Sequence, residues 1–129
     1  TTHGKRVHAI GKISEIFSGR GVTTSEATTN NPDHIEALAR CVQREGPGGE
    51  VDFVFANLED FDMLYGHRND PVNFARLLTE FDTFIGETLL PNLRPGALVG
   101  ITADHGNDPT TPSTDHSREY APLLLFGPS

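Results

Sequence analysis

The sequence has little cysteine and no long apolar run, and each shortage excludes a class of protein. Because Cys41 is its one cysteine, the chain has no internal disulfide framework and no thiolate-rich zinc site. Any metal ion must therefore be held by carboxylates and imidazoles, and a reducing, cytoplasmic location fits. The longest apolar stretch, residues 121–126, is far shorter than the roughly 20 residues that cross a bilayer.

Basic side chains are also scarce. The 129 residues include 10 Lys and Arg against 18 Asp and Glu, which gives a formal net charge of −8. A nucleic-acid partner is unexpected, because binding a phosphate backbone requires clustered cations that displace its counterions. Metal cations are the better match. The fractions of hydrophobic (36%) and charged (22%) residues are those of an ordinary globular domain.

Two further absences concern the chain start and one catalytic motif. The sequence opens Thr1-Thr2-His3-Gly4, without an initiator methionine or a charged-then-apolar leader. We therefore expect a piece of a longer protein. No Gly-x-Ser-x-Gly elbow is present, which argues against a serine hydrolase.

Turn residues divide the chain into alternating predicted strands and helices. A turn is expected at 14–19 and a polar loop at 21–31, where Ser, Thr and Asn dominate. Such an alternation predicts an α/β fold, with a mostly parallel sheet flanked by helices and joined by right-handed crossovers. The apolar run 51–58 indicates a strand buried on both faces. Predicted strands are 6–13, 51–58, 97–102 and 121–126, and predicted helices are 32–45 and 71 to about 91.

Histidines and carboxylates follow the ends of the predicted strands. In a parallel sheet, ligands collect at the carboxyl ends of the strands, so these loops should converge at one edge. Carboxylate and imidazole together suit Zn²⁺, Mn²⁺ or Fe²⁺ better than Ca²⁺. The candidates are Asp62 five residues before His67, Asp104 beside His105, and Asp115 beside His116.

A single pair of this kind is more often a solvated loop than a metal site, but three such pairs in successive loops favour a metal site. Neighbouring residues on an extended strand point to opposite faces. Asp104 and His105 can therefore serve one ion only where the strand has ended, and Gly106 permits such a bend.

Four cationic or thiol side chains have weaker claims to a role. Lys12, near a strand end, can neutralise a substrate phosphate, although most lysines are simply solvated. Arg68 and Arg118 are candidates for anchoring phosphate or for pairing with nearby carboxylates. Cys41 lies within a helical periodic pattern and is expected to be an inert packing residue.

The motifs around these residues resemble those of phosphopentomutases, a family within the alkaline phosphatase superfamily. The similarity runs in order over nearly the whole chain and points to the carboxyl-terminal part of the family's core. Its segments are Gly11-Lys12-Ile13 with Ile16-Phe17, Asn57 to Arg68 (NLEDFDMLYGHR), Thr102 to Thr110 (TADHGNDPT), and Thr114 to Tyr120 (TDHSREY).

The resemblance implies an enzyme that interconverts ribose or deoxyribose 1-phosphate with the 5-phosphate in nucleoside salvage. Such an enzyme uses two Mn²⁺ ions and a phosphothreonine. The resemblance also implies roles for six residues. Asp62, His67 and His116 hold one ion, Asp104 and His105 contribute to the other, and Lys12 binds the substrate phosphate.

Other family features have no counterpart in the sequence. In the family, a further metal-binding aspartate and the phosphorylated threonine come from the amino-terminal part of the core, and a separate cap domain carries much of the pentose-binding surface. We therefore expect residues 1–129 to be the C-terminal part of the metal-binding core domain, without the catalytic nucleophile and inactive alone. Strand edges left open should promote self-association.

Two other interpretations remain open. The chain can belong to another metalloenzyme of the same superfamily, such as a phosphoglycerate mutase or a phosphodiesterase. It can also be a non-catalytic metal-binding domain that keeps its ancestor's ligands.

Overall fold

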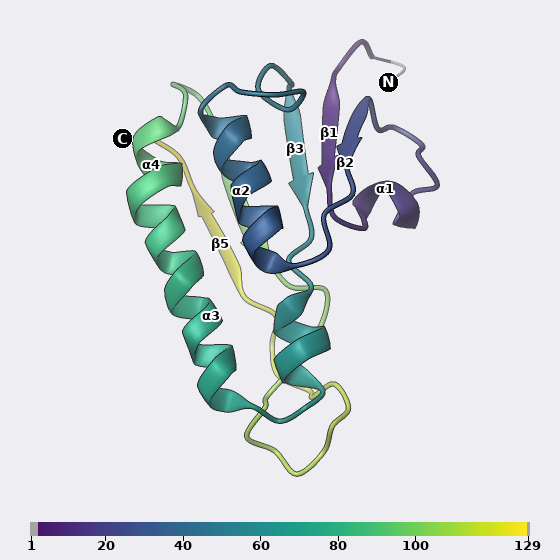
Figure 1. Cartoon of the computed structure of the whole chain (residues 1–129), viewed down its shortest axis with the longest axis vertical. Helices are drawn as coiled ribbons and strands as arrows, with labels where there is room; N and C mark the ends of the chain where they lie inside the picture. The colour runs from purple at the N-terminus through teal and green to yellow at the C-terminus, as the bar shows by residue number, and fades with distance from the viewer. Residues whose placement is uncertain (1–2, 129) are drawn as a thin grey trace. The chain divides into compact units, whose positions relative to one another are not determined.

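A computed structural model describes residues 3–128 of the chain (Figure 1). The chain consists of two compact units, the first ending at Glu59 and the second beginning at Asp60. Within the described residues, none of the helices combines the length and apolarity needed to cross a membrane.

The first unit is built on a parallel three-stranded sheet. Strand β1 (Val7–Ile10) lies at its centre, with β2 (Thr24–Glu26) on one side and β3 (Phe53–Ala56) on the other. His8 lies opposite Thr24 in one neighbour and opposite Val54 in the other. The parallel sheet and its helices confirm the predicted α/β class.

Helix α2 (Asn31–Val42) packs on this sheet and closes a small core. Ile10, Ala37 and Cys41 are buried together, with Leu38, Val54 and Ala56 packed against them. Burial raises the pKa of the Cys41 thiol to about 11, so this thiol stays protonated and unreactive at neutral pH. The prediction that Cys41 is a packing residue is confirmed.

The opposite face of β3 is open within the described residues. Phe53 is 55% exposed and Phe55 is 39% exposed, whereas the alternate residues Val54 and Ala56 pack against the core. The prediction that this strand is buried on both faces is therefore wrong. The cause is that α2 covers only one side of the short sheet, so residues of alternate parity remain in solvent.

Residues 14–19 were predicted as a turn and 21–31 as a loop, and both contain regular structure. A short helix, α1 (Ile13–Ile16), spans the end of the predicted strand 6–13 and the start of the turn, and the loop contains β2. β2 escapes a pattern search because its residues are polar. It is held by backbone pairing with β1 and by His8, whose ring nitrogens lie 2.8 Å from Thr24 Oγ1 and 3.2 Å from Glu26 Oε1.

The second unit contains a long helical segment and a strand pair. The predicted helix from residue 71 is present, and Leu77, Phe84 and Leu89 of its apolar face are buried. Its elements are the π-helix η1 (Phe61–Gly66), α3 (Pro71–Phe84), the π-helix η2 (Ile85–Leu89), α4 (Leu90–Asn92), β4 (Val99–Thr102) and β5 (Leu123–Phe126).

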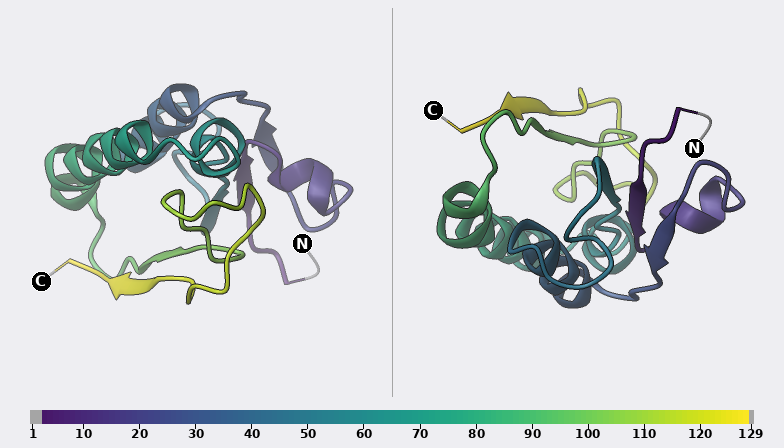
Figure 2. Two further views of the ribbon diagram at one scale, coloured as in Figure 1. Left: turned by 90° about the horizontal axis from the view of Figure 1, so that it is seen from below. Right: turned by 90° about the horizontal axis from the view of Figure 1, so that it is seen from above.

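Strands β4 and β5 pair with each other and run antiparallel (Figure 2). Val99 lies opposite Phe126 and Thr102 opposite Leu123. Both strands were predicted to join the parallel sheet, and in the described part of the chain neither does. Parallel pairing requires a crossover, usually a helix, whereas residues 103–122 contain no helix and return the chain in the opposite direction.

The leucines of β5 are exposed on both faces of the strand. Leu123, Leu124 and Leu125 are 70%, 51% and 62% exposed. An apolar strand at the edge of a sheet favours pairing with another chain. Self-association, expected from the sequence, stays a prediction.

Acid should weaken the start of α3. The pKa of the Asp70 carboxyl lies below its usual value, because the Asn73 side-chain amide (2.6 Å) and backbone N–H (3.0 Å) donate to it. A depressed folded-state pKa stabilises the protein above the unfolded pKa of about 4, and this contribution disappears as pH falls through the folded value. Asp70→Asn keeps a capping oxygen but cannot ionise. The stability advantage of the original chain over this variant, measured by urea unfolding from pH 7 to pH 3, should therefore shrink in acid.

Candidate metal centre

The site begins with an unusual turn of helix. The backbone N–H of His67 donates to the carbonyl of Asp62 at 3.1 Å, an i→i+5 bond that closes η1 as a π-helix. In an α-helix, residues five apart point about 140° away from each other. The wider π-turn instead places Asp62 and His67 on one side, which explains why a five-residue spacing serves here.

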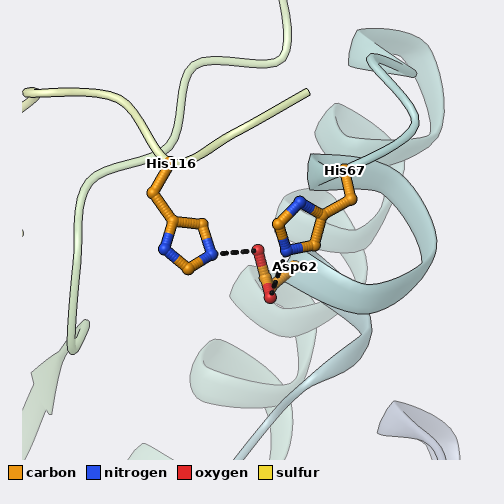
Figure 3. Close-up of side chains that lie close together, drawn as sticks. All are labelled: Asp62, His67 and His116. Carbon is orange, nitrogen blue, oxygen red and sulfur yellow. Dashed lines mark ion pairs between the residues drawn. The ribbon is translucent and has the colours of Figure 1, made fainter. Parts of the chain in front are cut away.

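Asp62 lies between two imidazoles (Figure 3). Its Oδ2 is 3.3 Å from His67 Nε2, and its Oδ1 is 3.4 Å from His116 Nε2. One potential ligand atom from each of the three residues lies within 4.8 Å of the others. The three side chains are between 31% and 46% exposed, so the cluster is open to solvent on one side.

The outer nitrogen of His67 is fixed by the backbone. His67 Nδ1 lies 2.6 Å from the Thr114 carbonyl oxygen, which can only accept, so Nδ1 carries the proton and donates. In the neutral ring, Nε2 is then left with a lone pair facing Asp62. A backbone carbonyl behind a histidine is the usual partner of a metal-binding imidazole.

The same surroundings favour a positive charge on His67. The pKa of His67 is raised, mainly by the Thr114 carbonyl and then by the Asp62 carboxylate. A divalent ion needs the neutral ring, so proton and ion compete for this nitrogen. The cluster therefore favours binding of a positive charge, either a proton on His67 or a metal ion.

His105 lies beside the cluster but outside it. Its ring stacks on that of His116, with centroids 3.5 Å apart and planes inclined by 13°. The backbone N–H of Ser117 donates to the Gly106 carbonyl at 3.2 Å, which holds the segments carrying the two rings together. The structure thus brings four of the five predicted metal ligands into one neighbourhood.

The fifth predicted ligand, Asp104, points into solvent. Its side chain is 92% exposed, and its Oδ1 is 3.5 Å from Nε2 of His105. β4 ends at Thr102, so Asp104 and His105 are past the extended strand and can face the same side, as the predicted bend at this point requires. They form a pair next to the three-residue cluster.

The remaining candidates are cationic. Lys12 lies just beyond β1, with its ammonium 2.5 Å from Glu59 Oε2, and this hydrogen bond raises the pKa of Lys12. Arg68 and Arg118 are exposed at the surface. Thr114 and Asn107 lie in the motif segments and contact the cluster, but the sequence did not reveal these contacts, since a backbone carbonyl and a loop amide carry no pattern.

The donor set itself fits a transition-metal ion. One carboxylate and two imidazoles are three ligands, the usual number in an open catalytic site that leaves positions for water or substrate. The absence of thiolate and the presence of nitrogen donors suit Zn²⁺ or Mn²⁺ better than Mg²⁺ or Ca²⁺.

Comparison with known proteins gives related sequences and related structures. Phosphopentomutase from Symbiobacterium thermophilum is 51% identical over 124 residues, which are 96% of this chain and 30% of that protein. Phosphopentomutase from Herpetosiphon aurantiacus is 50% identical over 128 residues, 97% of this chain and 31% of that protein. The chain thus spans about 30% of the length of these relatives.

The solved structure of the PH0037 protein from Pyrococcus horikoshii has the same fold. It matches with a TM-score of 0.69 over 95% of this chain and 38% of that one, at 22% sequence identity. The model of the metalloenzyme superfamily matches residues 6–129. With a carboxylate and two imidazoles meeting at one point of this fold, the chain belongs to the metalloenzyme superfamily.

Proposed function

We propose that this chain is the C-terminal part of the metal-binding core of a phosphopentomutase, acting on a pentose phosphate in the cytoplasm. Identity near 50% to phosphopentomutases over nearly the whole chain supports the substrate class. The observation that carries the proposal is the Asp62–His67–His116 cluster, because these three side chains are placed to bind a divalent ion.

Each proposed site residue has a task that its surroundings suit. Asp62, His67 and His116 hold one divalent ion, and Asp104 with His105 contributes to a second, both Mn²⁺ in the complete enzyme. Paired divalent ions supply charge neutralisation at the transferred phosphoryl group. The Thr114 carbonyl orients the His67 ring, and His105 packs flat on His116, which limits rotation of that ring.

Lys12 is proposed to bind the substrate phosphate. Its ammonium already contacts the Glu59 carboxylate at 2.5 Å. A phosphate that reaches Lys12 must therefore compete with Glu59, whose hydrogen bond raises the pKa of Lys12 and keeps it charged.

Residues 1–129 alone should not catalyse the mutase reaction. The nucleophile is proposed to lie outside them, and Asp104 with His105 offers the second ion only two ligands. In a coupled assay with ribose 1-phosphate and Mn²⁺, this chain is expected to stay at the background rate. Conversion well above that of a chain carrying His116→Ala would show that the proposal places the nucleophile wrongly.

Titration with divalent ions tests the metal site directly. The chain is expected to bind one Zn²⁺ or Mn²⁺ per molecule in the three-residue cluster, and Mg²⁺ more weakly, because imidazole nitrogen is a poor ligand for Mg²⁺. His67→Ala removes one of three ligands and should lower Mn²⁺ affinity at least tenfold.

The control is His3→Ala, an exposed histidine of the first unit. It should bind as the original chain does in calorimetry. Equal affinity in the chain and in His67→Ala would contradict the site.

The alternative functions differ in a measurable way. A phosphoglycerate mutase or phosphodiesterase uses similar metal ligands on another phosphate ester, so a substrate panel on the longer protein separates these enzymes from a phosphopentomutase. A non-catalytic metal-binding domain would bind the ion and turn over none of the substrates.

A further inference from the structure

A side-chain amide contacts the carboxylate at the centre of the cluster. Nδ2 of Asn107 donates to Oδ1 of Asp62 at 3.3 Å. The same Oδ1 lies 3.4 Å from Nε2 of His116. Asn107 is partly buried, and its amide and the His116 imidazole thus contact the same carboxylate oxygen.

The amide reaches Asp62 through a gap left by a glycine. A Cβ atom on Gly66 would lie 2.0 Å from Asn107 Nδ2 and 3.0 Å from the Phe61 carbonyl oxygen. Gly66 is buried, and its φ is not positive, so its backbone does not require glycine. The missing side chain makes room for the amide instead.

Neutral amide chemistry suits this place. Asp62 must keep its negative charge to attract a cation, and an Asn N–H can fix the carboxylate without adding a positive charge that repels the ion. A lysine or arginine in the same position would neutralise the carboxylate. A carboxylate without such a partner would rotate more freely, and it would lose more conformational entropy when it binds the ion.

Asn107 also connects two parts of the site. Asp62 belongs to η1, whereas Asn107 follows Gly106, whose carbonyl accepts from the Ser117 N–H next to His116. The amide therefore fixes the position of the carboxylate relative to the segment that carries the histidines His105 and His116.

We propose that Asn107 is a positioning residue that orients Asp62 for a divalent ion. The missing side chain of Gly66 leaves the space that the Asn107 amide occupies. This rests on the proposed metal site, and it adds a residue that no metal-ligand pattern identifies. Partners of this kind, hydrogen-bonded to a ligating group, change metal affinity by about 10- to 100-fold when removed.

The experiment measures Mn²⁺ affinity by calorimetry in the full 129-residue chain and four single variants. Asn107→Ala and Gly66→Ala should each weaken binding about 10- to 100-fold. Two matched controls should bind as the original chain does: Asn92→Ala, whose amide donates to the Thr88 carbonyl nearby, and Gly86→Ala, a glycine in η2 with open space around its Cβ position.

A double variant separates positioning from general damage. If Gly66→Ala acts by displacing the amide, it should add little in the Asn107→Ala background, because the Asn107 atoms that its Cβ would meet are gone and only the 3.0 Å contact with the Phe61 carbonyl oxygen remains. Unfolding of the ion-free chains, followed by circular dichroism, reports the structural cost separately. Should Gly66→Ala fail to fold, Asn107→Ala alone decides.

Each outcome has one meaning. Unchanged Mn²⁺ affinity in a folded Asn107→Ala chain overturns the positioning role, while loss of binding in His67→Ala keeps the metal site. Fully additive effects in the double variant overturn the role of Gly66 as the gap. Absence of Mn²⁺ binding by the original chain overturns the proposed metal site, and the positioning role with it.

Discussion

Replacing Asp62 by alanine is expected to abolish divalent-ion binding by this chain. Asp62 is the residue that both imidazoles face, with Oδ2 3.3 Å from His67 Nε2 and Oδ1 3.4 Å from His116 Nε2. Without it, two imidazoles remain with no negative charge between them. The loss should exceed the roughly 100-fold effect of removing an outer hydrogen-bond partner, because Asp62 is a proposed direct ligand.

The control is a carboxylate of the same sign nearby. Asp115 is exposed and contributes to the electrostatic field at His67, but it does not belong to the cluster. Asp115→Ala should weaken Mn²⁺ binding only slightly in 0.15 M salt, because salt at this concentration weakens interactions between exposed charges, with a Debye length of about 8 Å. Calorimetry and Co²⁺ absorbance can measure both variants. Equal losses in Asp62→Ala and Asp115→Ala would mean that net charge, and not ligation, attracts the ion.

The sequence located this cluster for a reason that the structure corrects. Parallel strand ends were expected to bring the loops after residues 58 and 102 to one sheet edge. In the described chain, β4 pairs with β5 and not with the parallel sheet. Two contacts join the loops instead: His67 Nδ1 donates to the Thr114 carbonyl, and the Asn107 amide donates to Asp62. Within each loop, the π-turn places His67 beside Asp62, and the backbone bridge at Gly106 holds the stacked histidine rings together.

The π-turn is invisible to pattern reasoning. Residues 61–66 (FDMLYG) are too few to establish a helical period, and an i→i+5 bond has no sequence signal of its own. By contrast, the helices from 31 and from 71 were predictable, because an Asn or Asp N-cap and a proline within the first two helical positions begin each of them. A helix cap can be predicted because it depends on neighbouring residues, whereas the site depends on contacts between residues far apart in the chain.

Contacts that position the ligands escaped prediction for the same reason. Asn107 and Gly66 are meaningful only as a pair, and nothing in either local sequence relates them. Thr114 acts through its carbonyl, which every residue has. Metal ligands could be proposed from residue type, but their partners required coordinates.

A single methyl group on Gly106 is expected to separate the backbone segment that carries His105, residues 104–107, from the segment next to His116, residues 117–119. Gly106 is buried, and a Cβ there would lie 2.1 Å from the Glu119 carbonyl oxygen and 2.8 Å from its carbonyl carbon. Both atoms are backbone, so neither can move as a side chain can. Gly106→Ala must push residues 104–107 away from 117–119, and overpacking of this kind costs about 1 to 3 kcal/mol.

Two consequences follow from that separation, since the Gly106–Ser117 bridge holds the stacked rings of His105 and His116. The urea midpoint of Gly106→Ala should fall, and the ring-proton chemical shifts that report stacking of His105 on His116 should move toward unstacked values. Gly100→Ala in β4 is the matched control, because its Cβ would make only an ordinary 3.4 Å contact with Leu125. If Gly106→Ala keeps both the midpoint and the stacked shifts, this bridge does not hold the site together, and the imidazoles must be positioned by η1 and the Thr114 carbonyl alone.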